Sequence, residues 1–590
     1  MCDGGEGMSV FKDLFWFFKQ EKRRYIWGIS LLVIVALLEL LPPKVIGYVI
    51  DELIKSSLNG KNLLFWVGLI FINGLLLYTF RFWWRRMIFG SSLKLAKQLR
   101  DDLYNHFTKM SPSFYQKNRI GDLMAHATND VQAVRETAGA GILTFVDSII
   151  LGGSVLVMMA VSISWKLTIL SLLPLPVMAI LTQYYGKLLH QRFHLAQESF
   201  SELNNKVQES MSGLKVIRSL GQSKEDIEAF KRQADTVVKN NMKVARIDAL
   251  FDPTIMLVVS VCYMIAVVYG SRLVIVNEIT VGQLITFVTY LGILIWPMLA
   301  IGWLFNIVER GRASYDRIRS LLSIEPEIKD SHHASTKLSM GEINYSIHSF
   351  KYNEASNFEL RDIKFSVQEG QTIGIVGKTG QGKTTLLKLL LREYEVVNGG
   401  ISVGDVNLKD TTLLALREHI GYVPQEHFLF SNTVKENIAF SQINSSIEDV
   451  YKAAEIANIH DDILEFPLGY ETVVGERGVS LSGGQKQRIS IARSLIKNPN
   501  ILILDDCLSA VDAKTEEKIL RSLKDERDGK TTFITSHRMS AVMHSDLIIV
   551  LDEGRIIQRG KHEELVQQNG WYKEMFERQQ LEELVEQGGR

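Results

Sequence analysis

A glycine-rich stretch with a lysine and adjacent threonines is the part of the sequence whose residue types and spacing best allow chemistry. Residues 377–384 read Gly-Lys-Thr-Gly-Gln-Gly-Lys-Thr, between a β-rich run, 372–376, and a helical run, 385–393. In this order, glycines let backbone N–H groups converge on phosphates, and the helix start adds a favourable dipole. We expect Lys383 to contact the β- and γ-phosphates of ATP and Thr384 to ligate magnesium. The predicted nucleotide-binding residues of this stretch are Gly377, Gly380, Gly382, Lys383, Thr384 and Thr385.

Two adjacent carboxylates follow a second apolar run. Residues 501–504 read Ile-Leu-Ile-Leu and lead into Asp505 and Asp506. A carboxylate at the end of a buried strand beside a phosphate loop is placed to hold magnesium, directly or through water. Asp505 is therefore the predicted metal ligand together with Thr384, and ATP and Mg²⁺ are the expected cofactors.

A pentapeptide between these motifs carries a resemblance to a known family. Residues 481–485 read Leu-Ser-Gly-Gly-Gln and precede a helical run, 486–495. With the phosphate loop and the paired aspartates, the pentapeptide resembles the signature of ATP-binding-cassette (ABC) proteins. The resemblance implies that the signature contacts ATP held by a facing subunit. Its predicted ATP-contacting residues are Ser482, Gly483, Gly484 and Gln485.

Further segments match this family in order and spacing. Tyr352 is similar to the aromatic residue that stacks on adenine, and His537 to the histidine that senses the γ-phosphate. Gln425 is similar to the switch glutamine, which is also implied as a metal ligand. Residues 509–512 resemble the loop that crosses the dimer, and residues 475–478 resemble the exporter segment that touches the long inner loops. The residues implied in catalysis are Gln425, Asp506 and His537.

Six apolar stretches lie before residue 310, each about the 20 residues that a helix needs to cross a membrane. The predicted spans are 25–50, 63–84, 138–161, 167–185, 254–276 and 284–307. Their connections are short on one side and long and charged on the other, at 85–137 and 186–253. Basic residues flank the long connections, so the positive-inside rule places these loops and both termini in the cytoplasm. We expect a multi-pass protein of the cytoplasmic (inner) membrane, with its nucleotide-binding domain in the cytoplasm.

The pattern predicts a multidomain protein. It combines an all-α bundle of six transmembrane helices, extended by long cytoplasmic helices, with an α/β P-loop domain. Breaks at 111–121 and 212–221 make the inner loops suited to docking on a cytoplasmic domain. The expected segments are 1–24, a tail with an interfacial helix against membrane lipids; 25–324, the transmembrane domain; 325–340, a linker; and 341–590, the ATP-binding-cassette domain.

Two carboxylates fall inside predicted spans, where a charge costs several kcal/mol. Glu39 lies deep in the first span and Asp147 inside the third. They could line a polar substrate cavity, or they could be held by helix-to-helix hydrogen bonds or by a neighbour such as Lys44. We also expect prolines to kink or break their helices. These are Pro42, Pro43, Pro174, Pro176 and Pro297.

The membrane half adds to the resemblance. Residues 251–254 (Phe-Asp-Pro-Thr), 296–299 (Trp-Pro-Met-Leu) and 305–311 (Phe-Asn-Ile-Val-Glu-Arg-Gly) carry a likeness to exporter subunits of the MdlA, multidrug-resistance-like type. The likeness runs from about residue 8 to about residue 582. It implies an ABC-type ATPase that acts as a translocase, exporting small amphiphilic, drug-like molecules by alternating access. A facing ABC half-transporter subunit is the implied partner.

Asp506 departs from the family pattern, in which a glutamate polarises the attacking water. The aspartate keeps the carboxylate but shortens its arm by one methylene, and catalysis needs the base within hydrogen-bond reach of its proton. We expect the site on this chain's own phosphate loop to bind ATP but to hydrolyse it poorly. Because the signature is intact, a heterodimer whose partner supplies a glutamate is favoured over a homodimer with two weak sites.

Other functions remain open at this stage. A lipid or peptide cargo is one alternative, and a nucleotide-gated regulatory protein or channel is another. A soluble DNA-repair-type ATPase with an apolar insert conflicts with the paired spans and their flanking charges. Lysine plus arginine equals aspartate plus glutamate at 66 each, so net charge provides no argument for a nucleic-acid partner, and none is expected.

Overall fold

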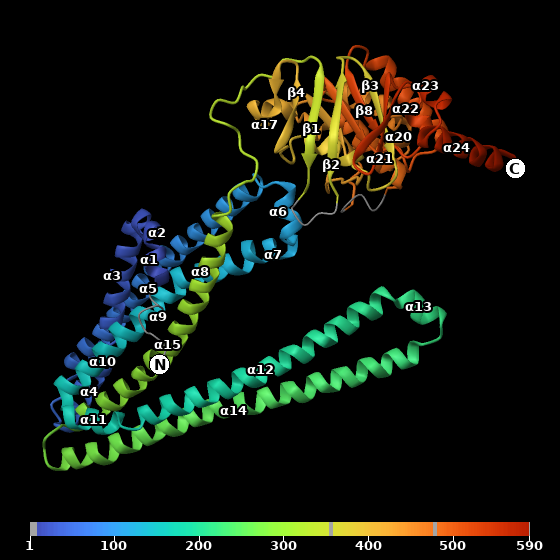
Figure 1. Ribbon diagram of the computed structural model, residues 1–590. Helices are drawn as coiled ribbons and strands as arrows, with labels where there is room; N and C mark the ends of the chain where they lie inside the picture. The colour runs from blue at the N-terminus through green and yellow to red at the C-terminus, as the bar shows by residue number, and fades with distance from the viewer. Residues whose placement is uncertain (1–8, 353–357, 476–480, 589–590) are drawn as a thin grey trace. The chain divides into compact units, whose positions relative to one another are not determined.

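The computed structural model describes residues 9–352, 358–475 and 481–588 (Figure 1). These residues divide into two compact units. The helical unit comprises the described residues of Met1–Phe107 and Ile120–Ile324, and the α/β unit comprises those of Thr108–Arg119 and Glu325–Arg590. Each unit has its own hydrophobic core, so each is described by itself.

Long helices make up the helical unit. Five described stretches are long and apolar enough to cross a membrane: Lys22–Ile54, Gly60–Phe107, Ile120–Leu172, Ser223–Ile275 and Val281–Leu322. They comprise α3 (Lys22–Leu38) with α4 (Leu41–Ile54), α5 (Gly60–Phe107), the segments α7 to α11, α14 (Ser223–Ile275) and α15 (Val281–Leu322). A further long helix, α12 (Leu175–Ser212), completes the set of six. The predicted fourth span, 167–185, therefore lies across the end of α11 and the start of α12.

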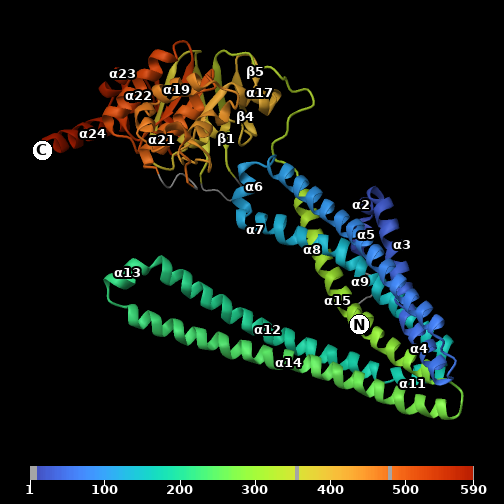
Figure 2. The ribbon, with the colours of Figure 1, turned by 180° about the vertical axis from the view of Figure 1, so that it is seen from behind.

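The third stretch is assembled from short helical segments joined by π-helical turns. These segments are α7 (Ile120–Ala125), α8 (Val131–Glu136), α9 (Ile142–Val146), α10 (Gly152–Met159) and α11 (Trp165–Leu172). Helix α15 runs beside α8 and α9 (Figures 1 and 2). The contact is close at Gly152, where a Cβ would lie 3.0 Å from the Cβ of Pro297.

The prolines divide into two groups. Pro42 and Pro43 lie in the first turn of α4, and Pro174 is the N-cap of α12, so these residues mark helix boundaries as expected. Proline suits a helix start because its missing N–H has no intrahelical partner there. Pro297 lies inside α15, which continues through it. Of the kink or break expected at this position, the break is therefore absent, and the buried Pro297 packs against Gly152 of α10.

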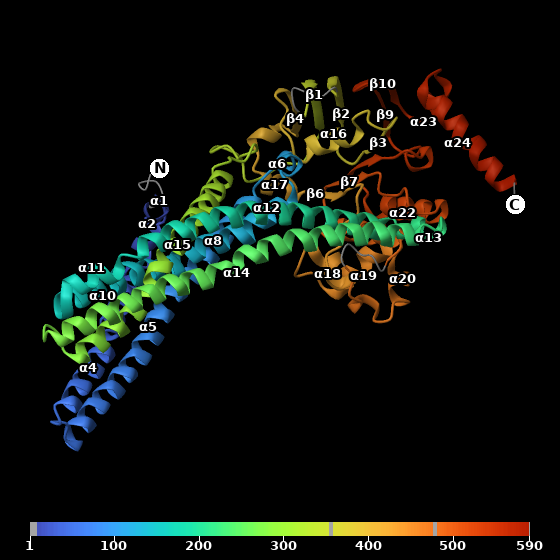
Figure 3. The same cartoon turned by 90° about the horizontal axis from the view of Figure 1, so that it is seen from below.

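The second inner loop is a long helical hairpin. Helices α12 and α14 lie side by side, and the short α13 (Leu214–Ser219) forms the tip (Figures 1 and 3). The backbone turns at Gly221, whose φ of +71° falls in the region that favours glycine. The tip therefore coincides with the break predicted at 212–221.

The described residues begin with two short helices, α1 (Ser9–Asp13) and α2 (Phe15–Gln20). Leu14 and Phe17 are buried in the core of the helical unit. Phe15 and Trp16 remain exposed at 63% and 37%. An apolar inner face and exposed aromatic residues suit the predicted place at a membrane surface.

The α/β unit contains two sheets. The four-stranded sheet has the order β2-β1-β4-β5 and is antiparallel. The larger sheet has the order β10-β9-β3-β8-β7-β6, parallel except for the edge strand β10. Strands of the first are β1 (Ile343–Phe350), β2 (Leu360–Val367), β4 (Asn398–Val403) and β5 (Val406–Asn407). Strands of the second are β3 (Thr372–Gly377), β6 (Ile420–Val423), β7 (Ile501–Asp505), β8 (Thr531–Thr535), β9 (Leu547–Asp552) and β10 (Arg555–Gly560).

The parallel strands explain where a site can form. Strand β7 is buried throughout, as expected of a parallel strand covered on both faces. Ligands of such sheets bind beyond the carboxyl ends of the strands. The helices of the unit are α6 (Pro112–Lys117), α16 (Lys383–Leu390), α17 (Leu413–Glu418), α18 (Val434–Ile438), α19 (Ile447–Ile456), α20 (His460–Leu464), α21 (Gly483–Leu495), α22 (Ala513–Glu526), α23 (His562–Gln567) and α24 (Trp571–Gly588).

Candidate functional site

The loop between β3 and α16 has the backbone of a phosphate-binding loop. Gly377, Gly380 and Gly382 have φ values of +151°, +83° and +100°, a region that L side chains rarely adopt. A Cβ on Gly377 would also lie 2.3 Å from the carbonyl oxygen of Leu551. The glycines thus give the loop its curvature and bring its backbone to the start of α16.

Lys383 is folded back into this loop. Its Nζ donates hydrogen bonds to the carbonyl oxygens of Gly377, at 2.8 Å, and Lys378, at 3.0 Å. Burial lowers the pKa of Lys383, and the carboxylates of Asp505 and Asp506 oppose that shift. The ammonium therefore lies in the centre of the loop, where phosphate oxygens would be its natural partners.

The carboxylate of Asp505 accepts hydrogen bonds from hydroxyl groups of three different segments. Its Oδ1 accepts hydrogen bonds from Thr384 Oγ1, at 3.0 Å, and Thr535 Oγ1, at 2.7 Å. Tyr422 donates to Oδ2 across 3.4 Å. The carboxyl group is almost fully buried, and burial raises its pKa although the two threonine hydrogen bonds lower it.

These groups fit a magnesium ion. A buried carboxylate is stabilised by a cation, and hydroxyl, carboxylate and amide oxygens are the hard ligands that Mg²⁺ takes. Mg²⁺ usually keeps waters and phosphate oxygens and needs only one or two protein ligands. The residues that the structure describes contain no group of three or more His, Cys, Asp or Glu side chains that could hold a metal ion. The structure thus brings the predicted ligands Thr384 and Asp505 together.

Asp506 lies at a sharp turn after β7. Its φ is +46°, in the left-handed region, and its N–H donates to Thr535 Oγ1 at 2.9 Å. The side-chain amide of Gln425, beyond the end of β6, donates to Asp506 Oδ2 across 3.3 Å. Gln425 was predicted as a metal ligand, and here its amide contacts Asp506 instead of Asp505. The two predicted catalytic side chains are therefore neighbours.

His537 follows β8 at the same edge of the sheet. Burial lowers the pKa of its imidazole, the Lys383 ammonium lowers it further, and Asp506 raises it. The lowered pKa favours the neutral form of the imidazole. The backbone of His537 is held from the C-terminal helix, because Gln579 Nε2 donates to its carbonyl oxygen at 2.7 Å. Gln579 lies far along the sequence, and no motif indicated it.

Tyr352 lies beside the start of α16. Its hydroxyl shares a hydrogen bond of 2.8 Å with Thr385 Oγ1. Its ring packs edge-on against Tyr394, with centroids 4.8 Å apart. The ring is thereby fixed close to the phosphate loop, and its stacking on adenine stays a prediction.

The signature forms the start of α21. Ser482 is the N-cap of this helix: its Oγ accepts from the Gln485 N–H, and Gln485 Oε1 accepts from the Ser482 N–H. These two hydrogen bonds form a capping box. The glycines of the first turn have no side chains to cover the helix N-terminus, and a helix N-terminus favours anions. A Cβ on Gly484 would lie 3.0 Å from the carbonyl oxygen of Ala510.

Two contacts fix the signature helix within the unit. Arg488 forms hydrogen bonds of 2.8 Å and 2.9 Å with the carboxylate of Asp462, which also accepts from Gln485 at 3.3 Å. Gln487 Oε1 accepts from the Ala510 N–H at 3.1 Å and so joins the signature helix to the 509–512 loop. The predicted loop-contacting segment, 475–478, lies largely outside the described residues.

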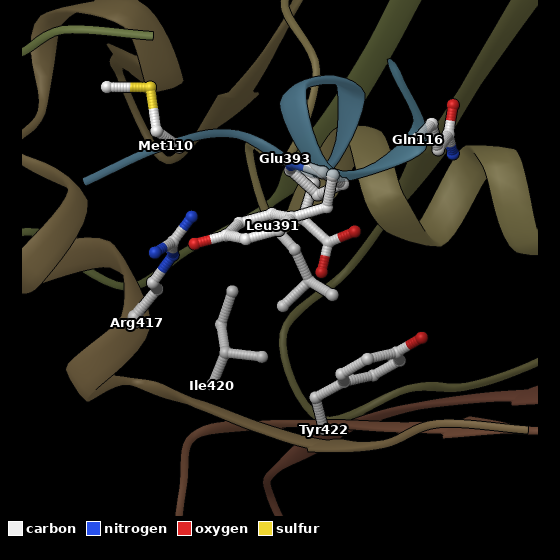
Figure 4. Close-up of a pocket in the computed structure, with 9 residues that line it drawn as sticks. Met110, Gln116, Leu391, Glu393, Arg417, Ile420 and Tyr422 are labelled. Atoms are coloured by element: carbon white, nitrogen blue, oxygen red, sulfur yellow. The ribbon is translucent and has the colours of Figure 1, made fainter. Parts of the chain in front are cut away.

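A cavity of about 690 Å³ lies under α6, within the α/β unit (Figure 4). Tyr422 lines this cavity, and its hydroxyl donates a hydrogen bond to Asp505. Burial raises the pKa of Glu393, another lining residue. Glu327 fixes α6, because its carboxylate accepts from Ser111 at 3.0 Å, Ser113 at 2.8 Å and Lys117 at 3.3 Å. The cavity is lined by Met110, Pro112, Tyr115, Gln116, Leu391, Glu393, Arg417, Ile420 and Tyr422.

The two carboxylates predicted within spans both lie close to side chains of other helices. Glu39 forms an ion pair and hydrogen bond with Arg81 of α5, so of the alternatives left open for this carboxylate the structure shows the helix-to-helix contact and not Lys44. Arg81 lies near the end of the second predicted span, 63–84, and reaches Glu39 across the α3–α5 contact, whereas Lys44 lies on α4, after the turn at Glu39. The side chain of Trp296 lies close to the carboxylate of Asp147. Trp296 and Trp303 are 50% and 59% exposed, and their rings meet edge-on at 5.6 Å.

A phosphate loop after β3, a buried carboxylate at the end of β7, a signature helix and a histidine beyond β8 together define an ABC-type ATPase. This ATPase is part of the same chain as the long apolar helices. A family model described as "ABC transporter transmembrane region" matches residues 25–298, and one described as "ABC transporter" matches residues 360–509.

Full-length relatives specify the family. The chain is 48% identical to the "Probable multidrug resistance ABC transporter ATP-binding/permease protein YheI" of Bacillus subtilis (strain 168), over 98% of this chain and 99% of the relative. It is 45% identical to the "Multidrug resistance-like ATP-binding protein MdlA" of Escherichia coli (strain K12), over 98% of each chain. The chain belongs to the MdlA-type, multidrug-resistance-like ABC ATP-binding/permease proteins.

A solved structure supports the fold. The "Structure of a bacterial Atm1-family ABC exporter with ATP bound" matches with a TM-score of 0.78 and 24% identity, covering 94% of this chain and 99% of that chain. The predicted combination of a six-helix exporter bundle with an α/β P-loop domain is thereby confirmed. The chain is a multi-pass membrane protein with an ATPase domain coupled to transport.

Proposed function

We propose that this chain is the hydrolysis-impaired subunit of a heterodimeric exporter of drug-like amphiphiles. It would lie in the cytoplasmic membrane, with its transmembrane domain at 25–324, a linker at 325–340 and its cytoplasmic nucleotide-binding domain at 341–590. The observation that carries the proposal is the short carboxylate of Asp506 at the position where the attacking water must be activated.

The residues at the carboxyl ends of the parallel strands account for nucleotide binding. Lys383 exchanges its two backbone carbonyl partners for β- and γ-phosphate oxygens, and Thr384 and Asp505 hold magnesium. Bound magnesium neutralises charge on the phosphate oxygens. Tyr352 supports the adenine, and His537 in its neutral form contacts the γ-phosphate.

The geometry of Asp506 supports weak hydrolysis. Its N–H is tied to Thr535 and its carboxylate to Gln425, so the backbone cannot advance freely to replace the missing methylene. A displacement of about 1 Å in a catalytic group can cost about a hundredfold in rate. This site would therefore hold ATP for long periods and act mainly as a nucleotide-dependent contact between subunits.

The intact signature supports an unequal partner. Ser482 and the first turn of α21 present backbone N–H groups that suit the γ-phosphate of a facing subunit's ATP. A partner with a full-length catalytic glutamate would give one competent site and one weak site. A homodimer would combine two weak sites, and its intact signatures would then have no competent site to complete.

The helical unit and the relatives support the proposed cargo. Two relatives carry multidrug-resistance names. Exposed Trp296 and Trp303 beside Asp147 provide aromatic surface with one polar acceptor, which suits amphiphilic molecules. ATP-driven closure of the two nucleotide-binding domains would move the helices from an inward-open to an outward-open state.

Affinity copurification from the native membrane tests the proposal. We expect a tagged chain to retain a different ABC subunit and the complex to show drug-stimulated ATPase in nanodiscs. A self-paired chain with full-rate ATPase would contradict the heterodimer. Stimulation by lipids or peptides alone would replace the drug-like cargo, and single-channel current without cargo flux would indicate a nucleotide-gated channel.

A further inference from the structure

We propose that Gln579, on the C-terminal helix α24, is a positioning residue for the switch histidine His537. The side-chain amide of Gln579 makes two hydrogen bonds to the backbone on either side of Arg538. Its Nε2 donates to the His537 carbonyl oxygen at 2.7 Å, and its Oε1 accepts from the Met539 N–H at 2.8 Å. Both distances are short for such bonds, and donor and acceptor are used in complementary directions.

The backbone of this segment needs such a partner. Met539 begins the short 3-10 helix Met539–Ala541, whose first N–H has no partner within the helix. The N-cap residue, Arg538, provides no side-chain cap. Met539 is also buried, at 2% exposure, so an unpaired N–H here would be costly. Gln579 supplies the missing cap from 40 positions further along the chain.

The same segment is tied on its other side to the loop that crosses the dimer. The Arg538 guanidinium donates to the carbonyl oxygen of Val511 at 2.9 Å and to that of Ser509 at 3.3 Å. It also pairs with the nearly inaccessible carboxylate of Glu516 at 2.8 Å. The turn that carries His537 is thus held between the 509–512 loop and α24.

Helix α24 is well placed for this role. Tyr572 is buried in the core of the α/β unit and its hydroxyl hydrogen-bonds to His562 Nδ1 at 2.8 Å. Phe576 packs on the same imidazole, with ring centroids 4.8 Å apart. Gln579 is one turn beyond Phe576 on the helix face that these contacts fix. The amide is therefore delivered by a rigid element, which is what a positioning residue requires.

The consequence concerns the discrimination of ATP from ADP. His537 acts on the γ-phosphate in the proposed function, on which this part of the inference rests. A loosened His537 backbone would weaken the contact to the γ-phosphate, while Lys383 and Tyr352 would still bind the part that ATP and ADP share. Loss of Gln579 should therefore lower the affinity for ATP and leave that for ADP nearly unchanged.

Hydrogen–deuterium exchange tests the two hydrogen bonds that Gln579 makes to the backbone beside Arg538. The purified complex would be compared as wild type, Gln579→Ala and Gln580→Ala, the last being an exposed neighbour of the same type on the same helix. We expect the peptide containing Met539 to exchange about fivefold faster in Gln579→Ala, the factor that a typical neutral hydrogen bond provides. The Gln580→Ala control should match wild type. Unchanged exchange in Gln579→Ala would show that Gln579 does not hold this segment of the backbone.

Photolabelling of this chain with 8-azido-ATP, with ATP and ADP as competitors, tests the consequence. We expect Gln579→Ala to weaken ATP competition about fivefold to tenfold and to change ADP competition by less than about twofold. Gln579→Glu keeps the acceptor for Met539 and loses the donor for His537, and it should show the same selective loss. An equal loss for both nucleotides would show a merely structural role. Neither experiment on Gln579 measures hydrolysis. Full-rate ATPase at the Asp506 site would therefore contradict the proposed function without bearing on the role of Gln579.

Discussion

The side-chain amide of Gln425 donates a hydrogen bond to the carboxylate of Asp506 across 3.3 Å. Gln425 follows β6 and Asp506 follows β7, and these strands are parallel neighbours in the larger sheet. This contact directs the carboxylate of Asp506 toward Gln425. The preceding residue, Asp505, accepts a hydrogen bond from Thr384. One methylene at this position is therefore expected to decide the rate of hydrolysis.

Asp506→Glu tests the length of the carboxylate. We expect the longer arm to restore water activation and to raise hydrolysis at this chain's site by up to about a hundredfold. The measurement is single-turnover hydrolysis of nucleotide bound to the purified complex. Asp506→Asn serves as the control, and it should show no rise because it cannot accept the proton. A rate for Asp506→Glu that stays at the wild-type value would show that the side-chain length is not limiting.

Thr384→Ala tests the magnesium site. The change removes a hydroxyl that lies 3.0 Å from Asp505 Oδ1. We expect the magnesium-dependent part of ATP affinity to fall at least about tenfold, as it does when supports of a metal site are lost. The measurement is ATP binding by this chain with Mg²⁺ and with EDTA. If the variant kept the full difference between the two conditions, the assignment of Thr384 would be wrong.

Asp462 predicts a pH dependence of the signature helix. Burial raises the pKa of Asp462, but its hydrogen bonds to Arg488 and the guanidinium charge outweigh that effect and hold the pKa below its usual value. A depressed carboxyl pKa stabilises the fold above the unfolded value of about 3.9. This contribution is lost as the pH falls through the lower, folded pKa.

Asp462→Asn should therefore remove stability at neutral pH and have little effect in strong acid. We expect a loss of about 1–2 kcal/mol at pH 7, from weakened charged hydrogen bonds at a partly exposed site. The measurement is the thermal midpoint of the α/β unit as a function of pH. A constant difference between variant and wild type down to pH 2–3 would contradict the linkage.

Gln487→Leu tests the connection between the signature and the 509–512 loop. Gln487 is 2% exposed, and its amide oxygen accepts from the Ala510 N–H. Leucine fills a similar volume and cannot hold the loop, so we expect the ATPase rate of the complex to fall about tenfold with a smaller change in ATP affinity. Steady-state ATPase assays with ATP titration provide both values. A wild-type rate would show that the loop is positioned by other contacts.

Local sequence order was enough to predict much of the site. The phosphate loop, Asp505 and the signature each combine a strand or helix boundary with residues adjacent in sequence, and the structure places them at those boundaries. The multidomain fold and the ABC resemblance were confirmed for the same reason. Spans are also local, since length and apolar content define them.

Contacts between distant segments could not be predicted in this way. Arg81 was missed as the partner of Glu39, because the choice between Arg81 and Lys44 depends on how α3 and α5 pack. Gln579 and Tyr422 were missed because their roles come from the folding of α24 and β6 against the site. Of the kink or break expected at Pro297 the break did not occur, because α15 continues through this residue.

Vanadate trapping with photoreactive, radiolabelled ATP on the complex purified from its native membrane tests the central claim most directly. Vanadate traps ADP only at a site that has hydrolysed ATP, so the labelled chain identifies the hydrolysing phosphate loop. We predict label on the partner subunit and little on this chain, with the label shifting onto this chain in Asp506→Glu. Equal label on both chains of the wild-type complex would contradict a hydrolysis-impaired site at Asp506.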